Sequence, residues 1–141
     1  MIERFDAYLF DLDGVITPTV LLHRRAWRET FDRVFAALGA APYAERDYFE
    51  SLDGKPRFEG VRALLAARGI ELPAGSDETS GAEAGGATGA AGESGADDLA
   101  TVLGIGDAKN RRFAELLERE GIEPYPGTVA LIDRLQAAGK P

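Results

Sequence analysis

Cysteine is absent from this sequence, and so are long hydrophobic runs. The lack of cysteine excludes disulfide scaffolds, catalytic thiols and thiolate metal sites. No apolar stretch is long enough to span a bilayer, and residues 1–6 lack the charged lead and apolar run of a signal peptide. Positive charge forms no stripe of the kind that binds nucleic acid. We expect a cytoplasmic protein, a monomer, with neither a membrane nor a nucleic-acid partner.

Negative charge is concentrated in one segment. The net charge of the 141 residues is −8, and residues 74–98 contribute six carboxylates without any Lys or Arg, which leaves about −2 for the rest. Between residues 75 and 97 the sequence is rich in Gly, Ala, Ser and Glu and has no large apolar side chain. Burial therefore cannot compensate for the entropy lost on ordering. We predict a disordered surface insertion at 75–97.

The remaining residues predict one strand and several helices. Phe5 to Phe10 is short, mostly apolar and followed by Asp-Leu-Asp-Gly, which indicates a buried strand that runs into a loop. Apolar residues at helical spacing, with glycines near the ends, predict helices over about 20–38, 44–51, 58–68, 98–120 and 128–138. Because a lone strand has no partner for its backbone groups, either the chain is truncated or a sheet partner comes from elsewhere.

Two carboxylates follow the predicted strand, Asp11 and Asp13. At the carboxyl end of a strand both can project into the crevice where open α/β sheets bind ligands. One carboxylate held on a cation can attack phosphorus, while the other carries a proton. Gly14 allows the sharp turn that brings the backbone close to a phosphate. The alternative is a polar turn without chemistry, and the bare pattern does not decide between the two.

Residues 10–17, Phe-Asp-Leu-Asp-Gly-Val-Ile-Thr, resemble the first motif of the haloacid-dehalogenase superfamily. This resemblance implies that Asp11 is the nucleophile that forms an aspartyl-phosphate and that Asp13 is the general acid/base. It also implies a Mg²⁺ ion held by the Asp11 carboxylate and the backbone carbonyl of Asp13, which suits a hard cation that prefers oxygen ligands. Gly14 would belong to the loop at the phosphate.

Further segments resemble the helical cap of the β-phosphoglucomutase-like branch of this superfamily. They are His23 to Trp27, the loop 52–57 with Gly54 and Arg57, and the segment 106–110 with Lys109 and Asn110. By resemblance His23, Trp27, Gly54, Arg57, Lys109 and Asn110 bind the substrate, with Arg57 on its distal phosphate. Taken alone, His23 and Trp27 would be packing residues, and Arg57 and Lys109 solvated charges.

The implied fold is α/β: a Rossmannoid core, of which this chain has the first strand and the last helix, with a mainly α-helical cap. Its parts would be 1–16 (first core strand and catalytic loop), 17–124 (cap with the insertion) and 125–141 (return helix). Residues 139–141 lie where relatives enter their second core strand, and Pro18 stands where many relatives have an acidic residue. The family's phosphate-binding Ser/Thr, its charge-neutralising Lys and its further metal ligands are then missing, and we expect this polypeptide alone to be inactive.

For the complete protein the resemblance implies a Mg²⁺-dependent phosphotransferase that acts on a sugar phosphate, β-phosphoglucomutase-like. One alternative is a sugar-phosphate phosphatase on the same scaffold, such as a trehalose-phosphate phosphatase. The other is a non-catalytic cap fragment or binding module. Arg57 and His23 favour the mutase, and sequence alone leaves the three open.

Overall fold

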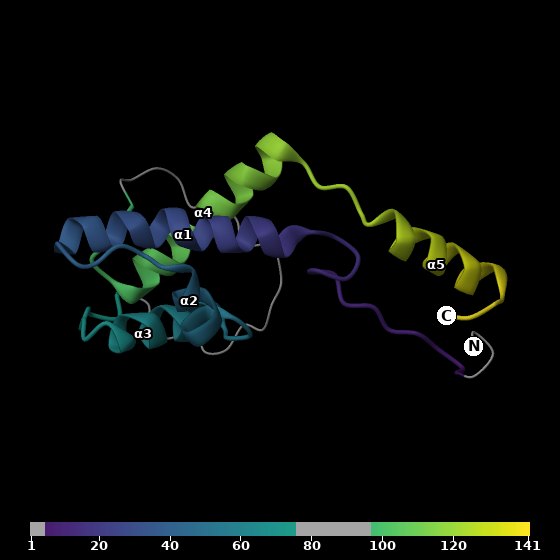
Figure 1. The fold of residues 1–141 in the computed structure, drawn as a ribbon, viewed down its shortest axis with the longest axis horizontal. Coiled ribbons are helices and arrows are strands. Elements are labelled where there is room, and N and C mark those ends of the chain that lie inside the picture. Colours follow the sequence, from purple (N-terminus) through teal and green to yellow (C-terminus); the bar gives the residue numbers. More distant parts are fainter. Residues whose placement is uncertain (1–4, 76–96) are drawn as a thin grey trace.

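A computed structural model of the chain describes residues 5–75 and 97–141. In the described part the regular elements are helical (Figure 1). They are α1 (Thr19–Leu38), α2 (Glu45–Asp47), the π-helix Tyr48–Leu52, α3 (Arg57–Ala67), α4 (Val102–Glu120) and α5 (Pro126–Ala137). All lie close to the ranges that the hydrophobic spacing predicts. None of the helices in these ranges is long and apolar enough to cross a membrane.

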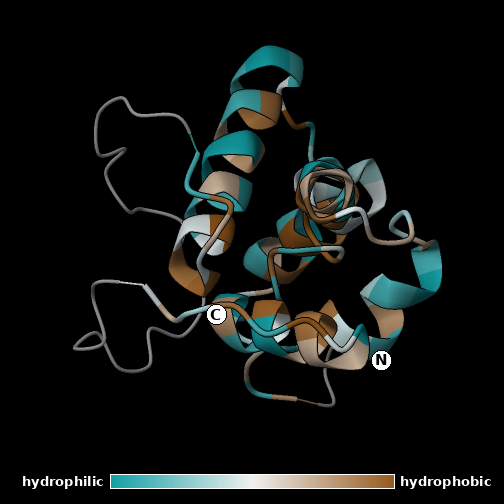
Figure 2. Cartoon of the chain, turned by 90° about the vertical axis from the view of Figure 1, so that its left-hand side faces the viewer, coloured by the Kyte–Doolittle hydropathy of each residue, from teal (hydrophilic) through white to brown (hydrophobic). Residues whose placement is uncertain are grey.

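The main body consists of α1, α2, α3 and α4, with α1 and α4 as its two long helices (Figure 1). Apolar residues three or four positions apart on α1, among them Trp27, Phe31 and Phe35, fall on one face and are buried against α3 and α4. In Figure 2 the helices carry hydrophilic and hydrophobic residues side by side, as amphipathic helices do. Trp27 is only 6% exposed, which confirms its expected place in the core.

Local signals in the sequence end the helices. Gly39 follows α1 with φ +64°, a left-handed conformation that glycine adopts without steric cost, and its N–H donates to the carbonyl oxygens of the last turn. At the start of α4, Thr101 is the N-cap, and its hydroxyl oxygen accepts from the backbone N–H of Gly104. The end of α1 and the beginning of α4 therefore lie at residues whose local chemistry favours a helix boundary.

Residues 5–16 and α5 form a second lobe beside the helical body (Figure 1). The expected strand at Phe5 to Phe10 is absent there: the segment is non-helical, its Tyr8 N–H donates to the Pro141 carbonyl at 3.1 Å, and Leu9 is 99% exposed. In the described ranges the nearest thing to a strand is an isolated bridge between Asp13 and Thr17. The prediction of a buried strand is wrong for this structure because no neighbouring strand pairs with the segment.

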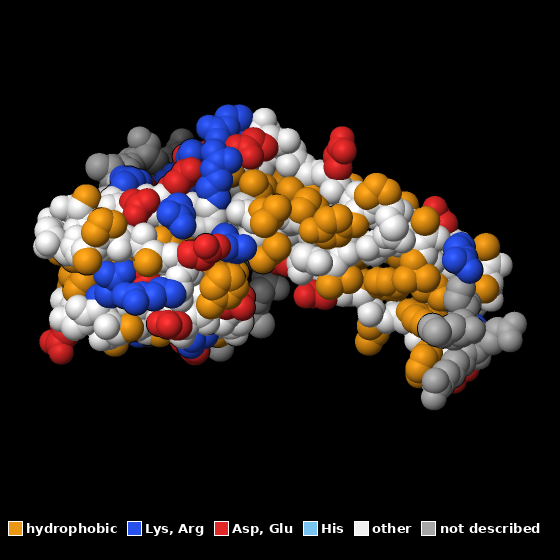
Figure 3. Space-filling model, in the orientation of Figure 1, with side chains coloured by type: hydrophobic (Ala, Val, Ile, Leu, Met, Phe, Trp, Pro, Cys, Tyr) orange, Lys and Arg blue, Asp and Glu red, His pale blue; other side chains and the backbone are white. Residues whose placement is uncertain are grey.

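Hydrophobic side chains remain exposed on this second lobe (Figure 3). Those that are about 40% exposed or more are Phe5, Leu9, Leu12, Val15, Tyr125, Val129 and Leu131. On α5 only Leu135 is buried. The lobe is thus amphipathic in sequence but lacks the cover that its apolar residues would have inside a core.

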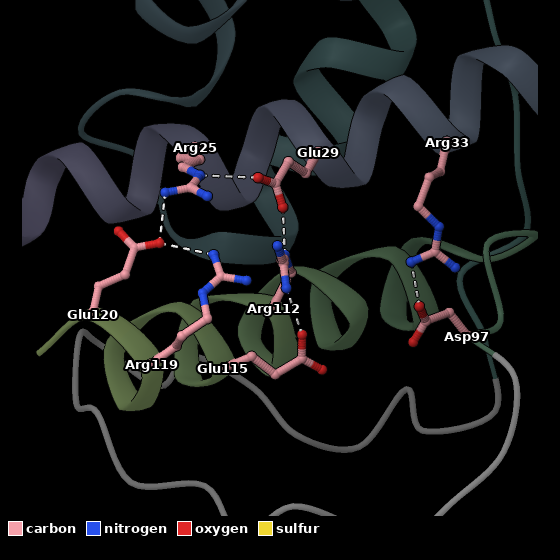
Figure 4. Close-up of polar contacts among 8 residues, drawn as sticks. All are labelled: Arg25, Glu29, Arg33, Asp97, Arg112, Glu115, Arg119 and Glu120. Carbon is pink, nitrogen blue, oxygen red and sulfur yellow. Dashed lines mark hydrogen bonds and ion pairs between the residues drawn. The ribbon is translucent and has the colours of Figure 1, made fainter.

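Ion pairs connect α1 with α4 and with Asp97 in the segment that precedes α4 (Figure 4). Glu29 on α1 accepts from Arg25 and from Arg112 of α4, and Arg33 pairs with Asp97. Asp97 also pairs with Arg111 and is therefore fixed to the body, contrary to its assignment to the insertion. Positions 76–96 of the predicted insertion lie outside the described residues.

Candidate functional site

Residues 11–17 form a compact, hydrogen-bonded turn. The Leu12 carbonyl oxygen accepts from the backbone N–H groups of Ile16 and Thr17, both at 3.0 Å. Gly14 has φ +79°, and its N–H donates to the Thr17 carbonyl at 2.7 Å. A residue with a side chain would be strained at this φ, so glycine is required for the turn itself. The turn leaves Asp11 and Asp13 on the exposed side of the loop.

The two aspartates have different surroundings. Asp13 is held by a threonine pair, because the Thr19 hydroxyl donates to its Oδ1 and also lies 3.0 Å from the Thr17 hydroxyl. Asp11 is exposed, and its Oδ1 accepts from the N–H of its neighbour Leu12 at 2.9 Å. Asp13 is therefore fixed at the start of α1, while the Asp11 carboxylate keeps an oxygen directed to solvent.

Asp13 faces a histidine and a lysine from the two long helices. His23 Nε2 lies 3.9 Å from Asp13 Oδ2, and the Lys109 Nζ lies 2.7 Å from His23 Nδ1. Phe113 stacks on the His23 ring with a centroid distance of 3.9 Å and an interplanar angle of 8°. Lys109 Nζ also lies 5.2 Å from the ring centroids of both Trp27 and Phe113. The polar groups thus form a row in the order Asp13, His23, Lys109, and the aromatic rings of Trp27 and Phe113 lie beside this row.

Burial shapes the protonation of this group. Lys109 is only 5% exposed, and burial, then the charge of Arg57, lowers its pKa to about 8. Burial, then the Lys109 charge, lowers the pKa of His23 to about 4, although Asp13 acts in the opposite direction. At neutral pH His23 is therefore a neutral imidazole. Since the ammonium group of Lys109 donates to Nδ1, the histidine proton lies on Nε2, toward Asp13.

Arg57 completes the positive side of the site. Its Nη1 lies 3.4 Å from Asp107 Oδ1 of α4, and its charge lowers the pKa values of both Lys109 and His23. The close approach of α3 and α4 depends on Gly106, because a Cβ there would lie 2.5 Å from Cε1 of Phe58. The absence of a side chain at Gly106 allows α4 to pack close to α3, so that Lys109 lies near enough to Arg57 for its pKa to be lowered by that charge.

The structure brings together some of the residues named from the sequence and separates others. Asp13, His23, Trp27, Arg57 and Lys109 form one cluster, through contacts or through their charges. No contact joins this cluster to the other predicted site residues of the described ranges, which are exposed or half-buried: Asp11, Gly14, Gly54 (φ +69°) and Asn110.

Sequence reasoning missed three supporting residues. Thr19 holds Asp13, Phe113 stacks on His23, and Gly106 admits the ring of Phe58. Thr19 could have been found, since a threonine at the start of a helix often bonds to a nearby polar group. Phe113 lies three positions before Leu116 among the buried residues of α4, and only the tertiary structure shows that its ring stacks on His23.

The loop offers oxygen donors of the kind that Mg²⁺ prefers. The Asp11 carboxylate and the carbonyl group of Asp13 are hard ligands, and Mg²⁺ in phosphate sites is held by one or two carboxylates together with waters and substrate oxygens. Within residues 5–75 and 97–141 no group of three or more His, Asp or Glu side chains could hold a metal. The residues present therefore fit part of a magnesium site.

Comparison with known proteins shows which family the chain resembles. The chain is 35% identical to proteins named beta-phosphoglucomutase from Mycobacterium bovis and Mycobacterium tuberculosis, over 97% of its own length and 49% of theirs. It is 29% identical to the CbbY protein of Rhodobacter capsulatus over 94% of the chain and 46% of that protein. The chain thus spans about half the length of these relatives. The family model described as haloacid dehalogenase-like hydrolase matches residues 5–141, and the chain belongs to that family.

Proposed function

We propose that this chain provides the nucleophile and the sugar-phosphate contacts of a Mg²⁺-dependent phosphotransferase of the β-phosphoglucomutase type. Asp11 would attack phosphorus, and Asp13 would transfer the proton of the accepting or leaving hydroxyl group. A bound Mg²⁺, held by the Asp11 carboxylate and the Asp13 carbonyl, would offset the charge that gathers on the phosphoryl group. Residues 17–124 would act as the cap over residues 1–16, and residues 125–141 as the return to the core.

The observation that carries the proposal is the convergence on Asp13. His23 Nε2 of α1 lies 3.9 Å from the Asp13 Oδ2 atom, and Lys109 Nζ of α4 lies 2.7 Å from His23 Nδ1, which supports a shared role for the three groups. The positive charge of Arg57 on α3 lowers the pKa values of both His23 and Lys109. A sugar phosphate bound against Lys109 and Arg57 would then have its hydroxyl groups near a proton-transferring carboxylate.

The surroundings of the two aspartates support their different proposed roles. Asp11 keeps an oxygen directed to solvent, as a nucleophile requires, whereas Asp13 is oriented by Thr19. Neutral His23, with its proton on Nε2, lies beside the Asp13 carboxylate without adding charge. Lys109 remains largely protonated at neutral pH and would supply positive charge to a phosphate or sugar oxygen bound beside it.

Substrate binding can be followed through unique reporters, since the sequence has one Trp and one His. Trp27 lies beside Lys109, so binding of a hexose phosphate with Mg²⁺ should change its fluorescence in a saturable way. We expect Lys109→Met to weaken this binding by roughly tenfold or more, because a charge-assisted hydrogen bond is lost. Lys140→Met, at a partly exposed lysine in the segment after α5, is the matched control. Equal affinities of the two variants would contradict the proposed substrate contact.

Catalysis is tested on the full-length gene product with a labelled hexose bisphosphate. We expect phosphate to appear on Asp11 and to be lost on treatment with hydroxylamine, which cleaves acyl phosphates. Asp11→Asn should abolish labelling, while Asp32→Asn, at an exposed aspartate of α1, should preserve it. Labelling that persists in Asp11→Asn would refute the nucleophile. Release of free phosphate in place of an isomerised sugar phosphate would identify the phosphatase alternative.

We also propose that the 141 residues alone bind the sugar phosphate but turn it over poorly. Each missing electrostatic contact to the moving phosphoryl group lowers the rate by roughly 10² to 10³. Turnover by this polypeptide at the rate of the beta-phosphoglucomutase relatives would contradict this. Absence of any Mg²⁺-dependent binding would instead favour a non-catalytic module.

A further inference from the structure

A cavity of about 300 Å³ lies on the face of α1 that is turned toward the start of α2. Its lining residues are Leu21, Arg24, Arg25, Arg28, Tyr43, Glu45 and Tyr48. The size lies at the lower end of the range for small-molecule sites. The residues of the candidate active site, Asp13, His23 and Lys109, are not among its lining, although the Asp13 charge contributes to the raised pKa of the lining residue Tyr48.

The arginines of this cavity are not equally paired. Arg24 pairs with Glu45, and Arg25 pairs with Glu29 and with a glutamate at the end of α4. Arg28 has no carboxylate partner among the described residues, and its guanidinium carbon lies 5.6 Å from the ring centroid of Tyr43. The cation–π contact fixes this group at the cavity but leaves its N–H donors and its charge available.

Tyr43 provides an independent indication of a ligand. The residue is 7% exposed, and its hydroxyl oxygen is buried without a hydrogen-bond partner in the described ranges. Burial and then Asp47 raise its pKa to about 12, whereas Arg28 and Arg24 act in the opposite direction, which places the hydroxyl in the field of both cations. It therefore stays protonated and can donate. A buried donor without an acceptor is uncommon, because its desolvation is not repaid.

We propose that this cavity binds a phosphate group, with the Arg28 guanidinium on its oxygens and the Tyr43 hydroxyl as a further donor. The available groups are donors, and the planar guanidinium fork matches two phosphate oxygens at once. Arg24, held by Glu45 at the rim, adds positive charge. The volume leaves room beyond the phosphate for a small organic part. The ligand is thus free phosphate or a small phosphate monoester, bound outside the Asp11 loop.

The test uses the isotopically labelled chain in phosphate-free buffer, titrated in parallel with inorganic phosphate and with glycerol 3-phosphate. We expect a saturable shift of the Arg28 Nε–Hε resonance and of the Tyr43 ring resonances. Arg28→Gln, followed through Tyr43, should weaken binding by roughly tenfold to a hundredfold. Tyr43→Phe, followed through Arg28, should weaken it by about threefold to tenfold. Tighter binding of the ester identifies an organic phosphate as the ligand, and equal binding identifies free phosphate.

Two control variants separate this cavity from other anion sites. Arg62→Gln, at an exposed position of α3, should leave the affinity unchanged. Arg57→Gln removes a cation of the candidate active site and should also leave the Arg28 shift unchanged. Circular dichroism and thermal unfolding show that each variant folds. The proposal is overturned if chloride at equal ionic strength gives the same shift, or if Arg28→Gln and Tyr43→Phe bind phosphate as the wild type does. The Tyr43 hydroxyl would then be satisfied by water only.

Discussion

Replacement of Lys109 by methionine should stabilise this protein at neutral pH. Lys109 is 5% exposed, and its ammonium group lies among Trp27, Phe113 and His23. Burying a charge is unfavourable unless its partners compensate fully, and burial is the largest cause of the lowered pKa. Methionine has a similar length and no charge, so it can fill the same space against the aromatic rings.

The size of the effect follows from the pKa. A fall from the ordinary 10.5 to about 8 corresponds to about 3 kcal/mol that the protonated lysine takes from the folded state. The variant also loses the hydrogen bond to His23 and the contacts with two aromatic faces, which together contribute about 1 to 2 kcal/mol. We therefore expect Lys109→Met to increase the free energy of unfolding by about 1 to 2 kcal/mol at pH 7.

The sign of the pH dependence tests the cause. Below pH 8 the lysine is protonated in both the folded and the unfolded state, and the folded state bears the full penalty. Between pH 8 and 10.5 the unfolded chain retains a proton that the folded protein has released, so wild-type stability rises relative to the variant. Urea unfolding at pH 7 and pH 10 should show the advantage of Lys109→Met disappear at the higher pH. Lys140→Met controls for the replacement of a lysine by methionine at a partly exposed position.

Two results would refute this reasoning. One is a variant that is less stable than the wild type at pH 7, which would mean that the contacts of Lys109 outweigh its desolvation. The other is a stability difference that is the same at both pH values, which would mean that the lysine does not titrate in this range. If the stabilisation is found together with weaker binding of hexose phosphate, the lysine is a residue whose function opposes stability.

Three further substitutions test the packing and the ion pairs, each by urea unfolding. Phe31→Ala removes a fully buried ring and should reduce the free energy of unfolding by about 3 to 5 kcal/mol. Gly106→Ala should reduce it by roughly 1 to 3 kcal/mol, since the new methyl group meets the ring of Phe58, whereas Gly127→Ala, with nothing within 4 Å, should not reduce it. Glu29→Gln removes the shared partner of two arginines on a partly exposed surface (Figure 4), so the loss should be about 0.5 to 1 kcal/mol and should shrink in 1 M NaCl.

The helices of this protein could be predicted from local signals. Apolar residues at helical spacing placed α1 within one residue at its start, and Gly39 was correctly assigned to its end. The beginning of α4 was predicted near Asp98 but is at Val102, because Thr101 provides the N-cap. The Asp98 carboxylate lies outside the helix and accepts hydrogen bonds from Ala100 and Thr101. Spacing and capping depend on residues a few positions apart, which a sequence displays directly.

The strand could not be predicted in the same way. The apolar run from Phe5 to Phe10 has the composition of a buried strand, but a strand exists only when neighbouring backbone satisfies its N–H and C=O groups. In this structure the segment lies beside α5 with Leu9 exposed. Composition therefore indicated that the segment could form a strand. Whether it does so depends on a neighbouring strand, which the residues of the segment do not specify.

The sequence by itself determined the helices, their ends and the family, because these depend on residue spacing and on a short motif around Asp11 and Asp13. Only the tertiary structure decided which residues meet. It brought His23, ten positions after Asp13, into contact with Lys109, more than 80 positions further along the chain, and left Asp11 exposed. It also buried the lysine and thereby lowered its pKa. Contacts between distant positions and the burial of a charge arise from packing, and neither is encoded in local pattern.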